Sequence, residues 1–126
     1  MQFAVRILKF ADALPNKISG RTIANQVARS GCSVASNYRA ALRGKSGADF
    51  INKITIVLEE ADETSFWIEL TGRAGLLPPK RLVKLRADAE ELFDRYLALA
   101  GEFEKPGRVH ALHAEPDKLH RADSFV

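Results

Sequence analysis

The chain lacks the residues on which many active sites and cross-links depend. Its single cysteine, Cys32, cannot form an internal disulfide, which agrees with a reducing compartment. No histidine occurs before His110, so a cysteine or serine nucleophile earlier in the chain has no histidine nearby in sequence to act as its base. Glycine-rich phosphate loops, zinc-ligand spacings and calcium-binding loops are also absent from the sequence. We therefore expect no enzymatic activity and no cofactor.

Long hydrophobic runs are missing as well. No stretch reaches the roughly 18 consecutive apolar residues that a membrane-spanning helix needs. The N-terminal segment MQFAVRILKFADALPNK carries charges within its apolar part, so we interpret it as a structural helix and not as a secretory signal. With 46% hydrophobic and 28% charged residues, the 126 residues fit one soluble domain. We therefore expect a cytoplasmic protein with no membrane partner.

Apolar residues recur at steps of three and four almost throughout the chain, which predicts helices and not strands. A first helix is expected over about residues 2–13, ended by Pro15, and Ser19 is expected to cap a second. Gly44 and Gly47 should bracket a hinge, and Ser46 with Asp49 should cap a third helix that ends at Gly72 and Gly75. Pro78–Pro79 should open a fourth helix that ends near Phe103. Short connections favour neighbouring helices that run in opposite directions.

The predicted fold is therefore all-α, an antiparallel up-down-up-down four-helix bundle over residues 1–104, followed by a C-terminal tail over residues 105–126. Ser30–Gly31 interrupts the apolar stripe of the second helix. We interpret this pair as a notch where another helix packs closely, with a helix break at Gly31 as the alternative. Four apolar residues lie off the main stripes and are candidates for a subunit contact: Ile51, Ile56, Phe66 and Val83.

Charge is unevenly distributed along the chain. Residues 1–58 hold nine Lys or Arg against two acids, a net charge of +7, whereas residues 59–104 hold six against eleven, a net charge of −5. Such asymmetry indicates either a surface that faces a polyanion or a basic face that meets an acidic face of another copy. Neutralisation between neighbouring helices of one bundle explains the same pattern without any partner.

Two sets of polar residues are candidate sites. Phosphate contacts with nucleic acid are assigned to Arg21, Arg29, Arg39, Arg43 and Lys45, with Tyr38 stacking on a base. A structural polar network is assigned to Ser30, Asn37, Glu60, Glu63 and Trp67. In this network we expect the acids of the third helix to lie beside Arg29, Arg39 and Arg43, and the indole N–H of Trp67 to find an acceptor.

Several short motifs fall between Leu14 and Leu77. They include RSGCS at residues 29–33, NYR at 37–39, DF at 49–50 and EEADETSFW at 59–67. Together they make this half of the chain resemble the four-helix-bundle family known as the 23S rRNA intervening-sequence proteins. Ala40 departs from the family pattern, in which a glutamate often follows the NYR element, and this puts one ion pair in doubt.

The resemblance implies an up-down bundle that assembles as a cyclic homopentamer around a central channel. Members are encoded within insertions in bacterial large-subunit ribosomal RNA genes or as solitary genes. A related branch, the accessory protein of diversity-generating retroelements, is a basic pentameric barrel that works with a reverse transcriptase and nucleic acid. The family pattern includes no enzymatic activity, and the function of most members is unknown.

Three hypotheses follow for the function. The first is a non-enzymatic, ring-forming protein that binds RNA or DNA or acts as an accessory scaffold. The second is a purely structural homo-oligomer whose basic and acidic halves neutralise each other. The third and weakest is a metal-dependent bundle enzyme. It would use the crowded acids near Glu60 or the pair His110 and His113, although the glutamate–histidine pairs of di-iron bundles are absent.

Overall fold

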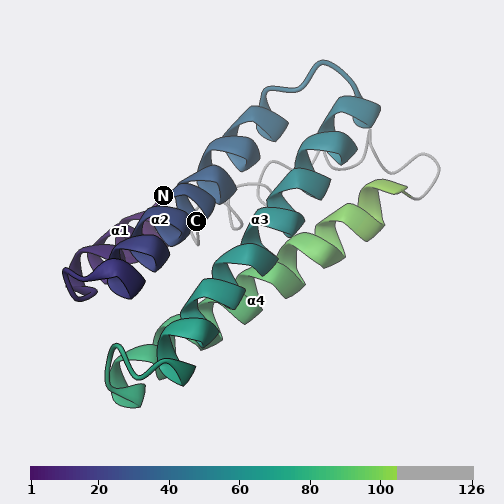
Figure 1. Ribbon diagram of the computed structural model, residues 1–126. Coiled ribbons are helices and arrows are strands. Elements are labelled where there is room, and N and C mark those ends of the chain that lie inside the picture. Colours follow the sequence, from purple (N-terminus) through teal and green to yellow (C-terminus); the bar gives the residue numbers. More distant parts are fainter. Residues whose placement is uncertain (105–126) are drawn as a thin grey trace.

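The computed structural model describes residues 1–104 and consists, over that range, of four helices with no strand (Figure 1). The helices are α1 (Gln2–Ala13), α2 (Ile18–Leu42), α3 (Gly47–Arg73) and α4 (Pro79–Glu104). The prediction of an all-α protein with four helices is therefore confirmed. The predicted tail, together with His110 and His113, lies outside the described residues.

Helices that follow one another in the chain pack side by side, α1 on α2, α2 on α3 and α3 on α4. In Figure 1, α2, α3 and α4 run along most of the length of the molecule, whereas the shorter α1 covers one end of α2. Their facing stripes enclose one hydrophobic core, whose most deeply buried large side chains are Ile7, Val27, Val34, Tyr38, Phe50, Ile54, Val57, Ile68, Leu92 and Tyr96.

The start of α3 follows the local sequence signal. Ser46 has an extended backbone and its side-chain oxygen accepts a hydrogen bond of 3.1 Å from the backbone N–H of Asp49. Such a cap satisfies one of the N–H groups that the first turn of a helix leaves without a partner. The predicted cap of α3 is therefore confirmed.

The start of α2 differs from the prediction. The helix begins at Ile18 with Lys17 as its cap, and no side chain caps it, so the assignment of Ser19 as the cap was wrong. The preceding turn packs tightly against the first helical turn, since a Cβ placed on Gly20 would lie 1.9 Å from the carbonyl oxygen of Pro15. The carbonyl of Pro15 can lie this close only because Gly20 has no side chain. Gly20 therefore lies inside the helix, which begins two residues before it.

The end of α3 depends on a glycine in the left-handed region. Gly75 has a φ of +66°. Its N–H donates to the carbonyl of Gly72 and the N–H of Leu76 donates to the carbonyl of Thr71, both at 3.1 Å. This pair of bonds is the Schellman pattern of helix termination. Gly72 itself lies in the last turn, where a Cβ would come within 3.2 Å of Leu82 on α4.

The predicted notch in α2 is confirmed, and the alternative of a helix break is wrong because α2 is continuous through Gly31. A Cβ on Gly31 would lie 2.5 Å from Cγ2 of Ile7, so the missing side chain is what lets α1 approach α2. Ile56, Phe66 and Val83 are exposed as predicted, whereas Ile51 is partly buried against the core. Leu97 on α4 is also exposed, at 52%.

Candidate functional site

A buried pair of hydroxyl groups joins α2 to α3. Ser30 and Thr64 are both fully buried, and their side-chain oxygens lie 2.8 Å apart. The Thr64 oxygen is also 2.8 Å from the carbonyl oxygen of Glu60, and the Ser30 hydroxyl is 3.3 Å from the carbonyl oxygen of Val27. Each buried hydroxyl thus has one partner on its own helix and one on the neighbouring helix. The contact between the two hydroxyls fixes the register of α2 against α3.

Arg29 forms an ion-pair cluster beside these hydroxyls. Its guanidinium lies 3.1 Å from a carboxylate oxygen of Glu60 and also pairs with Glu63. The hydrogen bond from Arg29 lowers the pKa of Glu63 below its ordinary value of 4.5, against the opposing effect of desolvation. The same bond raises the pKa of Arg29. With the Arg29 side chain 47% exposed, this cluster is screened by water and stabilises the fold only modestly.

Of the two remaining members of the predicted polar network, Trp67 lies beside the Arg29 cluster and Asn37 lies away from it. Trp67 lies near enough to Glu63 to contribute to the lowering of its pKa. However, the buried indole nitrogen has no acceptor within hydrogen-bond geometry among the described residues. Asn37 donates within α2, to the carbonyl and the hydroxyl oxygen of Ser33, both at 2.9 Å. Asn37 therefore stands apart from the cluster of Arg29, Glu60 and Glu63.

Three cations at the α2–α3 connection remain exposed. We call Arg39, Arg43 and Lys45 the hinge cluster. They make no ion pair with the described residues, so the expected pairing with the acids of α3 is found for Arg29 but not for Arg39 or Arg43. Cations whose charge is not neutralised nearby are available to phosphate groups.

The six residues assigned to nucleic acid do not form one surface within a single chain. Arg21 hydrogen-bonds to Asn16 near the start of α2, about 33 Å along the helix from Arg43 at about 1.5 Å per residue. Tyr38 is 1% exposed and its ring packs 5.0 Å from that of Tyr96 at an interplanar angle of 49°. The assignment of Tyr38 as a base-stacking residue was therefore wrong, because it belongs to the core stripe of α2.

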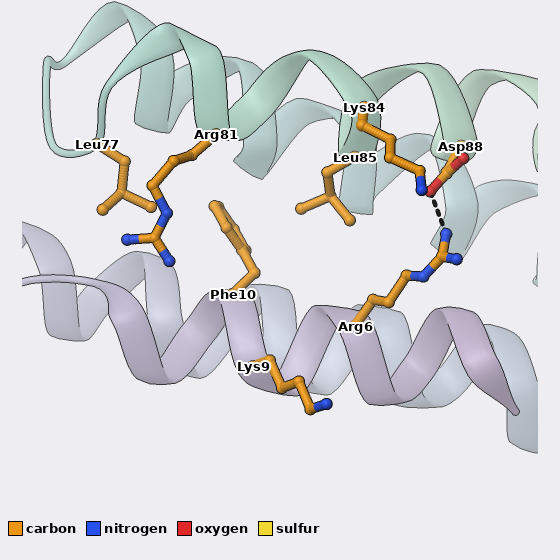
Figure 2. A pocket seen from close by; sticks show the side chains of 8 residues that line it. All are labelled: Arg6, Lys9, Phe10, Leu77, Arg81, Lys84, Leu85 and Asp88. Carbon is orange, nitrogen blue, oxygen red and sulfur yellow. Dashed lines mark hydrogen bonds and ion pairs between the residues drawn. The ribbon is translucent and has the colours of Figure 1, made fainter.

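A second group of cations was missed by averaging charge over half of the chain. The first turns of α4 carry Lys80, Arg81, Lys84 and Arg86. Two of them border a cleft of about 270 Å³ between α1 and α4, which is lined by Arg6, Lys9, Phe10, Leu77, Arg81, Lys84, Leu85 and Asp88 (Figure 2). Counting charge over one or two helical turns would have revealed these residues, because the acids of α4 begin at Asp88.

The described residues contain no group of three or more histidine, cysteine or carboxylate side chains placed to hold a metal ion. None of the described helices combines the length and apolar character needed to cross a membrane.

The fold and the seam between α2 and α3 define a small all-α protein of four packed helices. The chain belongs to the 23S rRNA-intervening sequence protein family, whose model matches residues 1–96. It is similar to a solved structure from Bacteroides thetaiotaomicron, a protein with unknown function from the S23 ribosomal protein family. The two are 34% identical with a TM-score of 0.74, over 79% of this chain and 92% of that one. No curated protein matches the chain.

Proposed function

We propose that this protein is a non-enzymatic scaffold that assembles as a ring of antiparallel, up-down-up-down bundles, a homopentamer, and binds the RNA or DNA backbone. The observation that carries the binding half of this proposal is the hinge cluster of Arg39, Arg43 and Lys45, which is exposed and makes no ion pair among the described residues. A reverse transcriptase is included among the candidate partners on the family resemblance alone.

Self-association is supported by α1, which carries apolar residues on both of its faces. Phe3, Ile7 and Phe10 are buried against the bundle, whereas Val5 and Leu8 are each 44% exposed on the outer side. A helix that is apolar on both sides is typically buried on both sides. A neighbouring subunit would cover the outer face of α1.

The outer face of α3 is a suitable partner for α1. Ile56 and Phe66 are exposed there, on a stripe that also carries Glu59, and Asp62 is exposed nearby. The outer side of α1 carries Lys9 and Asp12 beside its apolar residues, so the two faces complement each other mainly in apolar area. Contact between two different faces is head-to-tail, and such contacts form a ring when the rotation from one subunit to the next closes on itself.

Ring formation would multiply the effect of the hinge cluster. Three cations on one bundle make a weak field, but a cyclic assembly repeats them around its axis and their potentials add. Nucleic acid is a polyanion that responds to such a summed field, with strong dependence on salt concentration. The proposed ring and the proposed binding therefore support each other.

A purely structural role without nucleic acid remains the second candidate function. It is favoured by the pairing of Arg29 with Glu60 and Glu63 and of Arg6 with Asp88, because these contacts show basic residues already neutralised by acids of the same chain. In that case the hinge cluster would serve subunit contacts, and neutralising it would weaken the assembly.

The test compares two double variants of equal charge change. Arg39→Gln with Arg43→Gln removes two cations of the hinge cluster, whereas Arg73→Gln with Arg95→Gln removes two cations that pair with acids one turn away on α3 and α4. Binding of labelled single-stranded RNA and DNA is measured by fluorescence anisotropy at low and moderate salt, with particle mass measured in parallel. We expect the hinge variant to bind about tenfold more weakly and with a shallower salt dependence than the control.

The outcomes separate the two functions. Loss of binding with an unchanged particle mass in the hinge variant supports the nucleic-acid scaffold. A fall in particle mass in the hinge variant alone supports the structural role. Absence of binding by the unaltered protein to both RNA and DNA at low salt contradicts the nucleic-acid proposal outright.

A further inference from the structure

The cleft between α1 and α4 has an apolar floor and a basic border. Figure 2 shows Phe10 rising from α1 between Leu77 and Leu85, which come from the α4 side. Arg81 extends from α4 toward α1, and Lys84 borders the same space. The volume of about 270 Å³ is at the small end of ligand sites, and it suits one or two fused rings or a medium-length acyl chain.

The charges that line this cleft do not cancel. Four cations and one acid border it, which gives a net charge of +3. Asp88 is paired with Arg6, and this bridge closes one end of the cleft in Figure 2. The side chains of Arg81, Lys84 and Lys9 make no ion pair or hydrogen bond with other described residues, although Lys9 extends away from the cleft. The cleft therefore presents Arg81 and Lys84 as cations without a protein counter-ion.

The polar groups of the lining restrict the chemistry of an occupant. Arginine and lysine side chains only donate hydrogen bonds, and one oxygen of Asp88, the one acidic side chain of the lining, is already engaged by Arg6. An occupant must then bring acceptors and a negative charge, but it finds few partners for donors of its own. Nucleobase edges, which carry N–H donors, fit this lining poorly. A carboxylate fits it well, because arginine binds a carboxylate through two parallel hydrogen bonds.

We propose that the α1–α4 cleft binds a small amphipathic anion, with an apolar aromatic or acyl body on Phe10 and Leu85 and a carboxylate on Arg81 and Lys84. This site is separate from the hinge cluster and does not depend on the proposed nucleic-acid binding. The first turns of α4 lie at this site, and the partial positive charge of a helix N-terminus adds to the attraction for an anion.

The ligand preference is tested on the full chain with naphthoate as the probe, by titration calorimetry and by amide chemical shifts. We expect saturable binding with the largest shifts in residues 6–10 and 77–88. Acetate, which keeps the anion without the body, and naphthalenemethanol, which keeps the body without the charge, should each bind about tenfold more weakly. Equal binding of naphthoate and acetate, or shifts located elsewhere, would overturn the proposal.

The residues are tested with two double variants that carry the same charge change on the same helix. Arg81→Gln with Lys84→Gln alters the cleft, whereas Lys80→Gln with Arg86→Gln alters neighbouring cations that do not line it. The cleft variant should bind naphthoate about tenfold more weakly, with the control changed less than about twofold. Equal losses in both variants would show a general electrostatic effect and contradict a built site, as would the absence of saturable binding to the unaltered protein.

Discussion

The seam between α2 and α3 and the seam between α1 and α4 differ in how closely their side chains pack and in how their charges are paired. Where α2 meets α3, the buried side chains of Ser30 and Thr64 are hydrogen-bonded, and the half-exposed Arg29 pairs with Glu60 and Glu63 beside them. Where α1 meets α4, a cleft of about 270 Å³ separates the helices, and Arg6 forms an ion pair with Asp88 across it. The α2–α3 seam is thus closely packed around a buried hydrogen bond, whereas the α1–α4 seam leaves a cleft with an excess of cations.

The difference shows where stability and binding reside. Buried, satisfied hydrogen bonds across a close-packed seam fix one arrangement of two helices, and any loss is costly. An ion pair whose arginine is half exposed beside a cleft contributes little to stability, and the other cations of the cleft stay available to ligands. Stability in this molecule should therefore depend on the α2–α3 seam and the α1–α2 notch, whereas binding should depend on Arg81, Lys84 and the hinge cluster.

The largest expected loss comes from filling the notch between α1 and α2. Gly31→Ala places a Cβ 2.5 Å from Ile7, and we expect the free energy of unfolding to fall by about 2 kcal/mol once a gain in helix propensity is deducted. Gly101→Ala in α4 is the control, because no atom from another part of the described chain lies within 4 Å of its added Cβ, and it should stabilise by up to about 1 kcal/mol. Urea denaturation measures both, and changes of the same sign would contradict the close approach at Gly31.

A smaller loss should follow from removing the hydroxyl that links α2 to α3. Thr64→Val keeps the shape of a fully buried side chain but takes away the partner of Ser30, which should cost about 1 kcal/mol. Thr55→Val removes an exposed hydroxyl that bonds to the carbonyl of Ile51 on the same helix, and it should leave stability nearly unchanged. If the two variants unfold at the same urea concentration, the link across the seam contributes nothing.

An effect that depends on pH should follow from Glu63→Gln. The folded-state pKa of Glu63 is lowered by its bond to Arg29, so its contribution is complete above the ordinary value of 4.5 and is lost as pH falls through the lower folded value. The half-exposed pair should contribute about 0.5 kcal/mol at neutral pH. Thermal unfolding between pH 7 and pH 3 should show wild type and variant converging in acid, whereas Glu91→Gln in an exposed pair should show a smaller change.

The smallest loss is expected at the open seam. Arg6→Gln breaks the ion pair with Asp88, and because the Arg6 side chain is about half exposed the cost should stay below about 0.5 kcal/mol. Calorimetric unfolding of this variant beside Glu63→Gln compares the two seams directly. A loss at Arg6 that exceeds the loss at Thr64 would reverse our ranking of the seams.

Features set by neighbours in sequence were predictable, and features set by distant neighbours were not. The cap at Ser46 and the termination at Gly75 depend on residues within one turn, and both were found as expected. Ser19 failed as a cap because the start of α2 is decided by the packing of Pro15 against Gly20. The notch at Gly31 was predictable as a site of close approach, but its partner Ile7 was not.

The candidate sites show the same limit. Tyr38 lies next to cations in the sequence, yet its position on the helix turns it toward Tyr96 and away from solvent. The acids of α3 were expected beside three arginines of α2, but the structure brings Glu60 and Glu63 to Arg29. The α1–α4 cleft joins residues more than 60 positions apart, a juxtaposition that no local pattern encodes.

We propose that the exposed outer face of α1, with Val5 and Leu8, is covered by a neighbouring subunit in a closed ring. Light scattering on a sizing column in moderate salt measures the native mass directly. We predict a single species at five times the 13.9 kDa mass of the chain, independent of concentration over the micromolar range. A species with the mass of one chain would contradict the ring, and with it the summed basic field on which the proposed nucleic-acid binding depends.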